Sequence, residues 1–148
     1  EIYQYSGFEP GRVRVLQALD MAAGPLRRPY PVPVTWVRQV GQGRLFYTNL
    51  GHTPSTWNDP RFRRQIVEAI RWTGGRTEAP AAPNPTVQDA AALAAFAAVE
   101  GLSPQVSPAD PAATAAAIRN LQRLHPEKHD GDPAAWDQAV ARLRAAFR

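Results

Sequence analysis

The chain has 148 residues, which is room for one domain or two small ones. It contains no cysteine, which excludes a disulfide framework, a thiolate metal site and a cysteine nucleophile, and no run approaches the roughly 18 apolar residues of a membrane span. The net charge of +4 comes from residues 1–74, which hold ten arginines against five acidic residues. Arg61, Arg63 and Arg64 cluster beside Phe62, but this segment is amphipathic, which favours a solvated helix face over a nucleic-acid site.

Three strands are expected in the first half. Residues 13–19 alternate apolar and polar side chains, which is the period of a strand. Residues 34–40 and 44–50 are rich in β-branched and aromatic side chains. The tight connection Gly41-Gln42-Gly43 predicts that these last two strands form a hairpin.

A helix start follows the third strand. Asp59 has the side chain of an N-cap, and Pro60 fits the first helical position. The spacing of the following apolar residues predicts a helix from Pro60 to about Thr73, which Gly74 ends.

The composition changes after residue 74. Residues 1–74 hold four alanines and residues 75–148 hold twenty-two, and the three prolines within residues 80–85 predict an extended linker. We expect a domain at 1–74, the linker at 75–85 and a small helical domain at 86–148. Its three helices are predicted from Thr86, with Asp89 at capping-box spacing, to about Glu100; from Asp110-Pro111 to about Leu124; and from Asp132-Pro133 onward.

A series of motifs in the first half occurs in a fixed order. They are Pro33-Val34-Thr35-Trp36, Gly41-Gln42-Gly43-Arg44-Leu45-Phe46-Tyr47, Leu50-Gly51-His52, Trp57-Asn58-Asp59-Pro60-Arg61-Phe62 and Ile70-Arg71-Trp72. With Glu1-Ile2-Tyr3-Gln4-Tyr5 before them, they resemble the C-terminal end of the trehalose-utilisation (ThuA-like) family over residues 1–73. The resemblance implies an α/β fold, the C-terminal part of a flavodoxin-like domain related to class I glutamine amidotransferases, and an association with sugar utilisation.

The family domain also has an N-terminal half with the first parallel strands. Parallel sheets are covered on both faces, and three strands with one helix do not achieve that. We therefore expect the chain to be a fragment or to be completed by a partner chain, and its uncovered sheet to favour self-association. Because the chain has no cysteine, the amidotransferase reaction cannot be assembled from it, and whether it is an enzyme stays open.

His52 is the candidate catalytic residue. It follows the third strand at the edge where open α/β sheets bind ligands. The amidotransferase relatives place a catalytic histidine similarly, with a glutamate two residues on, whereas this chain has Pro54 there. His52 is read either as a general base, metal ligand or sugar hydrogen-bond donor, or as a loop histidine bonded to nearby backbone.

Trp57 and Asn58 are the candidate substrate-binding residues. An indole stacks on the apolar face of a pyranose, and a carboxamide bonds paired hydroxyls. The alternative is structural: Trp57 packs at the helix start, and Asn58 or Asp59 caps it.

The second half resembles a J-domain. The resemblance rests on residues 96–99, Gly101-Leu102-Ser103-Pro104, His125-Pro126-Glu127-Lys128-His129, Gly131-Asp132-Pro133 and the apolar residues Val140, Leu143, Ala146 and Phe147. It implies that His125, Pro126 and Glu127 form a turn between two antiparallel helices that docks on an ATPase chaperone. Two features depart from the family: Glu127 stands in place of aspartate, and the preceding helix is weakly basic. The alternative is a helical appendage without such a site.

The leading expectation is a carbohydrate-associated domain that binds a sugar or glycoside, with a hydrolase-like site at His52. The alternative is a non-enzymatic interaction module whose tail binds a chaperone or another protein. No phosphate loop, metal-ligand pair or nucleophile elbow is recognisable, so no cofactor, nucleic acid or membrane partner is expected. The location is left open between cytoplasmic and exported.

Overall fold

The computed structural model describes residues 3, 5, 8–23, 25, 27–103 and 105–147. The chain forms two compact units. The first, here called the sheet unit, comprises Glu1–Ala18 and Pro33–Pro85, and the second, the helical unit, comprises Leu19–Val32 and Thr86–Arg148. The mixed α/β content expected from the sequence is confirmed.

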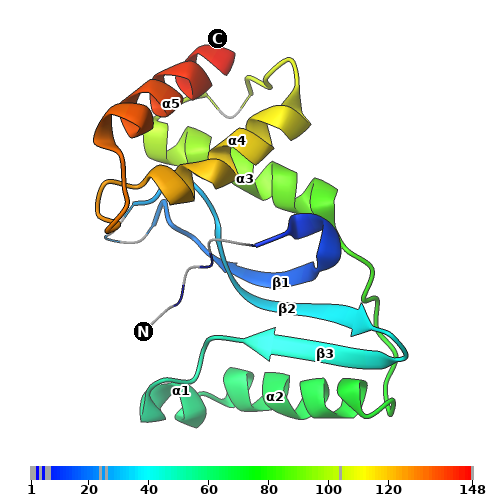
Figure 1. The fold of residues 1–148 in the computed structure, drawn as a ribbon. Helices are drawn as coiled ribbons and strands as arrows, with labels where there is room; N and C mark the ends of the chain where they lie inside the picture. Colours follow the sequence, from blue (N-terminus) through cyan, green and yellow to red (C-terminus); the bar gives the residue numbers. More distant parts are fainter. Residues whose placement is uncertain are drawn as a thin grey trace. The chain divides into compact units, whose positions relative to one another are not determined.

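The sheet unit contains a three-stranded sheet in the order β1-β2-β3 (Figure 1). A single 3₁₀ turn, Pro10–Arg12, precedes β1, which spans Arg14–Leu19; β2 spans Val32–Val40 and β3 spans Gly43–Thr48. β2 and β3 pair antiparallel, with Trp36 opposite Tyr47, so the expected hairpin is confirmed. Trp36 and Tyr47 stack with ring centroids 4.2 Å apart.

Two helices follow β3. The helix α2, Pro60–Thr73, has the predicted bounds and buries Phe62 and Trp72, while Figure 1 shows it alongside β3. Asp59 is its N-cap, because its carboxylate accepts a hydrogen bond from the Arg61 backbone N–H. The short helix α1, Pro54–Asn58, was not predicted and occupies most of the stretch expected to be a loop.

The segment that follows α2 bonds to the sheet unit at both ends. Arg44 of β3 donates to the carbonyl oxygen of Thr77 at 2.9 Å and forms an ion pair with Glu78. The Asn84 carboxamide accepts from the Val15 N–H at 2.9 Å and donates to the Val15 carbonyl at 3.0 Å, as a neighbouring strand would. Residues 76–84 contain no helix or strand, but they lie against the sheet unit rather than forming a free spacer.

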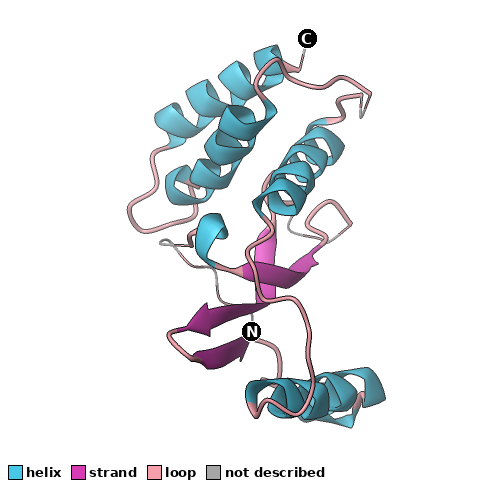
Figure 2. Cartoon of the chain, turned by 90° about the vertical axis from the view of Figure 1, so that its right-hand side faces the viewer, coloured by secondary structure: helices cyan, strands magenta, loops and turns pink. Residues whose placement is uncertain are grey.

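The helical unit contains three helices that lie alongside one another (Figure 2). They are α3 at Pro85–Glu100, α4 at Pro111–Leu124 and α5 at Pro133–Ala146. The starts of α4 and α5 match the prediction, and Asp110 and Asp132 cap them. The predicted capping box of α3 is wrong, because the helix begins at Pro85, before Thr86, and the Asp89 carboxylate accepts from Arg119 of α4 at 2.6 Å.

The connection between β1 and β2 belongs to the core of the helical unit. Met21, Tyr30 and Val32 are buried in one cluster with apolar side chains of α3, α4 and α5. This stretch lies within residues 1–74, which were expected to form one domain. Its large apolar side chains instead pack with those of the alanine-rich helices, among them Phe96, Ile118 and Leu121. None of the described helices is both long and apolar enough to cross a bilayer.

Candidate ligand-binding site

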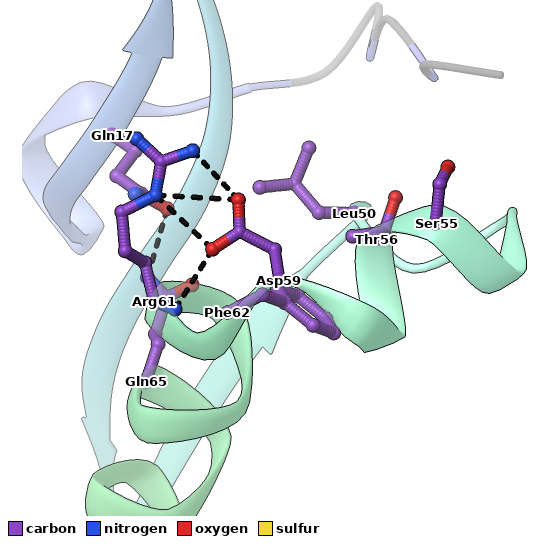
Figure 3. A pocket seen from close by; sticks show the side chains of 8 residues that line it. All are labelled: Gln17, Leu50, Ser55, Thr56, Asp59, Arg61, Phe62 and Gln65. Carbon is purple, nitrogen blue, oxygen red and sulfur yellow. Dashed lines mark hydrogen bonds and ion pairs between the residues drawn. The ribbon is translucent and has the colours of Figure 1, made fainter.

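A cavity of about 530 Å³ opens in the sheet unit beside the start of α2. Its size is within the range of pockets that bind small molecules. The lining combines amide, hydroxyl, charged and apolar side chains from β1, α1 and α2 and from the segment after β3 (Figure 3): Gln17, Leu50, Ser55, Thr56, Asp59, Arg61, Phe62 and Gln65. Most of these groups form hydrogen bonds with neutral polar ligands.

Asp59 supplies the one carboxylate among these lining residues. Its oxygens accept from Arg61 Nε at 3.1 and 3.2 Å and from Arg61 Nη2 at 2.6 Å, as Figure 3 shows. The side-chain hydrogen bonds from Arg61, followed by its backbone N–H, lower the pKa of Asp59 to about 2. Asp59 is therefore a fixed anion at neutral pH, offset by Arg61, and is not suited to exchanging protons there.

Gln17 and Gln65 meet at one wall of the cavity. Gln65 Nε2 donates to Gln17 Oε1 at 2.8 Å, so β1 and α2 are joined by their side-chain amides. Gln17 Oε1 also accepts from Thr35 Oγ1 of β2 at 2.8 Å. Neither amide was singled out from the sequence, because the contact depends on strand order and on where α2 packs.

Ser55 and Thr56 bring hydroxyl groups to the cavity from the unpredicted helix α1. A signal for this helix is present in the sequence: Thr53-Pro54 has the same pattern of a capping residue and a proline as Asp59-Pro60. The Thr53 side chain forms no cap hydrogen bond to the helix backbone and instead lies 2.8 Å from the Ser55 hydroxyl. Helix α1 therefore lacks the cap that gives α2 its sharp start.

The three sequence-predicted site residues lie next to the cavity along the chain but are not among the described residues that line it. His52 is exposed in the bend between β3 and α1. Trp57 is half exposed; its Nε1 donates to the Gly51 carbonyl at 2.8 Å, and its ring packs edge-on against Phe62. Asn58 is exposed at the end of α1. The structure thus shows Trp57 in the packing role, with part of its indole still open to solvent.

Gly51 shapes the chain between β3 and α1. Its φ of 114° is a conformation that side chains rarely adopt, and a Cβ there would lie 3.3 Å from the Phe62 ring. A glycine is therefore needed at this position for two reasons: the turn requires its backbone conformation, and the rings of Trp57 and Phe62 pack closely against its Cα. The described residues contain no group of three or more histidine, aspartate or glutamate side chains placed to hold a metal ion.

The comparison with protein families decides how the first half is classified. Residues 1–73 match the ThuA family, trehalose utilisation. The match confirms the resemblance recognised from the motifs, and every residue that lines the cavity lies within this ThuA segment. The comparisons with curated proteins and with solved structures gave no match.

The predicted partner-binding turn lies outside the ThuA segment, between α4 and α5. His125 is buried, whereas Pro126 and Glu127 are exposed. Arg28 Nη1 lies 2.6 Å from His125 Nε2, and Arg28 Nη2 donates to the Glu127 carboxylate. The His125 ring also lies edge-on to Trp136 of α5, with centroids 4.9 Å apart.

A neutral imidazole has one acceptor nitrogen, so His125 accepts either from Arg28 at Nε2 or from the Glu127 backbone N–H, which lies 3.2 Å from Nδ1. Burial lowers the pKa of His125, and the positive charge of Arg28 lowers it further. The hydrogen bond from Arg28 lowers the pKa of Glu127. The turn therefore holds a neutral histidine beside an ionised glutamate, and the J-domain resemblance stays a prediction.

Proposed function

We propose that the ThuA segment binds a neutral carbohydrate in the cavity beside α2, as part of a sugar-utilisation protein. The observation that carries the proposal is the lining of this cavity, to which Ser55 and Thr56 bring hydroxyls, Gln17 and Gln65 bring amides, and Asp59 and Arg61 bring a compensated ion pair. Such groups match the alternating donors and acceptors of sugar hydroxyls. The exposed part of the Trp57 indole adds an apolar surface close by along the chain.

The family match favours a larger domain than the one that the described residues form on their own. We propose that these strands are the C-terminal part of a flavodoxin-like domain, completed by an N-terminal half or a partner chain. Leu16 on β1 and Val40 on β2 are exposed apolar side chains of the sheet, which supports a missing cover. Sedimentation at increasing concentration tests this, because a stable monomer would contradict an uncovered apolar face.

Within this proposal His52 is the proton-transfer residue of a hydrolase-like reaction, and Trp57 and Asn58 contact the sugar. The ionised Asp59 supports this assignment, because a hydrolytic step near neutral pH needs a titratable group other than that carboxylate. In the intact protein His52→Ala is expected to lower turnover of a disaccharide about 10²–10⁴-fold. Normal turnover by that variant would place the reactive group elsewhere.

Binding itself is tested by titrating the chain with trehalose and with glucose while following backbone amide signals by NMR. Shifts are expected at Ser55, Thr56 and Gln65 and at the Trp57 indole N–H. Gln65→Ala should weaken binding, and Gln42→Ala at the exposed hairpin turn is the matched control. Shifts scattered over the surface, or none, would contradict a carbohydrate site in this cavity.

The alternative is an interaction module in which the turn after α4 contacts a chaperone or another protein. The placement of His125, Pro126 and Glu127 between α4 and α5 supports it. Stimulation of the ATPase activity of an Hsp70-type chaperone, lost on Pro126→Ala, is the expected result. Absence of stimulation by the folded chain would remove the chaperone as the partner.

A further inference from the structure

A line of hydrogen bonds runs through the sheet unit to the cavity. The Leu50 backbone N–H donates to Thr48 Oγ1 at 3.2 Å, Thr48 Oγ1 lies 3.0 Å from Thr35 Oγ1, and Thr35 Oγ1 donates to Gln17 Oε1 at 2.8 Å. Thr35 and Thr48 are opposite each other in the β2–β3 register. Thr35 has 0% of its surface exposed, so its hydroxyl must find its partners within the protein.

The direction of each bond follows from counting hydrogens. A threonine hydroxyl has one hydrogen to donate and two lone pairs. Because Thr35 donates its hydrogen to Gln17, the bond between the threonines must be donated by Thr48. Thr48 in turn accepts from the Leu50 N–H. Each hydroxyl therefore both donates and accepts. Every bond in the line is donated in the same direction, and the last acceptor is the side-chain oxygen of Gln17.

Gln17 Oε1 receives a second bond from Gln65 Nε2 at 2.8 Å. Both lone pairs of this oxygen are then used, and the amide group of Gln17 is fixed with its Nε2 donors directed away from the two bonds. Among the described residues no acceptor is bonded to Gln17 Nε2 and no donor to Gln65 Oε1, while both side chains line the cavity (Figure 3). The cavity wall thus presents a donor from Gln17 and an acceptor from Gln65, two residues whose side-chain amides are joined by a hydrogen bond.

We propose that Gln17 Nε2 and Gln65 Oε1 together recognise one hydroxyl group of the bound ligand, with Thr35 and Thr48 as positioning residues; this rests on the carbohydrate function proposed above. A hydroxyl satisfies both groups, because its oxygen accepts from Gln17 and its hydrogen is donated to Gln65. A carboxylate has no hydrogen to donate to Gln65 Oε1, so it would satisfy only one of the two groups, and the Asp59–Arg61 ion pair offers it no net charge to bind. An alcohol-rich neutral ligand is therefore selected over an anionic one.

The direct test is Gln17→Glu. The new side chain keeps oxygens that accept from Thr35 and Gln65 but loses both N–H donors, so trehalose or glucose affinity should fall about tenfold to a hundredfold. Gln42→Glu introduces the same charge at the exposed hairpin turn and should leave affinity unchanged. A sugar analogue lacking the recognised hydroxyl should bind wild type weakly and show little further loss with Gln17→Glu.

The positioning role is tested by Thr35→Val and Thr35→Ser. Valine has a similar shape but no hydroxyl, so the Gln17 amide should lose its fixed orientation and sugar affinity should fall, while serine restores both. The ¹⁵N-edited signals of the Gln17 side-chain amide report the orientation without any ligand. If Thr35→Val does not fold, Thr48→Val takes its place, because it removes the donor to Thr35 and should cause the same loss of orientation and affinity.

The outcomes separate the two proposals. If wild type binds neither sugar, the carbohydrate function is overturned, and the recognition role falls with it. If wild type binds but Gln17→Glu binds equally well, the recognition role alone is overturned. If Gln17→Glu weakens binding but Thr35→Val leaves both the amide signals and the affinity unchanged, recognition stands and positioning by the threonines is overturned.

Discussion

Two valines of the helical unit, Val32 and Val87, differ strongly in solvent exposure. Replacing each by alanine therefore compares a buried with an exposed valine. Val32, the first residue of β2, is 2% exposed and lies in the cluster with α3, α4 and α5, whereas Val87 on α3 is 63% exposed. Valine to alanine removes two methyl groups, at about 0.8 kcal/mol each when buried. The cavity left behind raises the expected cost of Val32→Ala to about 2–2.5 kcal/mol.

That cost corresponds to a fall in melting temperature of roughly 8–20 °C for a unit of this size. Val87→Ala should change stability by less than about 0.5 kcal/mol, since it removes little buried surface and alanine favours the helix. Thermal unfolding followed by far-ultraviolet circular dichroism, which reports the helices, measures both variants. Equal melting temperatures for the two would refute the inclusion of the segment Leu19–Val32 in the helical core.

Three further outcomes are expected. Because burial lowers the pKa of His125 in the folded chain, protonation on acidification favours the unfolded chain, so the free energy of unfolding should fall as the pH drops through about 6.5; His125→Gln should reduce this dependence in urea titrations, and an unchanged dependence would contradict it. A Cβ at Gly131 would lie 2.2 Å from the His125 carbonyl oxygen, so Gly131→Ala should cost about 1–3 kcal/mol of unfolding free energy, and a smaller loss would contradict the close approach. Asp59→Ala should cost about 0.5–2 kcal/mol through loss of the cap, most of it recovered in Asp59→Asn, as chemical denaturation can measure.

Helix starts were predictable from the sequence because the signals are local. Asp59, Asp110 and Asp132 each stand before a proline, and in all three helices the aspartate accepts from a backbone N–H of the first turn. The prediction at Thr86 was wrong because the Asp89 side chain has a tertiary partner in Arg119, which residue spacing within one helix does not show. Helix N-caps were therefore predicted correctly where the cap depends only on residues that are close in sequence.

The division into units depends on packing that the chain order hides. The composition change after residue 74 is real, yet the segment with Met21 and Tyr30 lies within the arginine-rich half and packs with the alanine-rich helices. The alanines of these helices bury little apolar surface, so the core needs large side chains, of which the helices supply only part. Tyr30, with 1% of its surface exposed, meets this need, but its role is visible only after the chain has folded.

The candidate site shows the same contrast between local and non-local signals. Gly51 and His52 were recognised from their place after a strand, while Gln17 and Thr35 carry no local mark of a site. Gln17 occupies a polar position in a strand of alternating apolar and polar side chains. Thr35 is one of several β-branched residues in its strand, and nothing in the sequence distinguishes it from the others. Their hydrogen bond requires β1 beside β2, and the bond to Thr48 requires the register of β2 with β3. Polar networks across strands therefore escape an analysis of motifs.

Asp59 links the two kinds of signal. Its position before Pro60 identifies it as a helix cap. The Arg61 side chain, followed by the Arg61 backbone N–H that forms the cap, lowers the pKa of this carboxylate at the cavity wall to about 2. A carboxylate fixed in this way contributes a permanent acceptor to the cavity and cannot act as an acid near neutral pH. Recognition and proton transfer would consequently fall to different residues, with the amides of Gln17 and Gln65 serving the first and His52 remaining the proposal for the second.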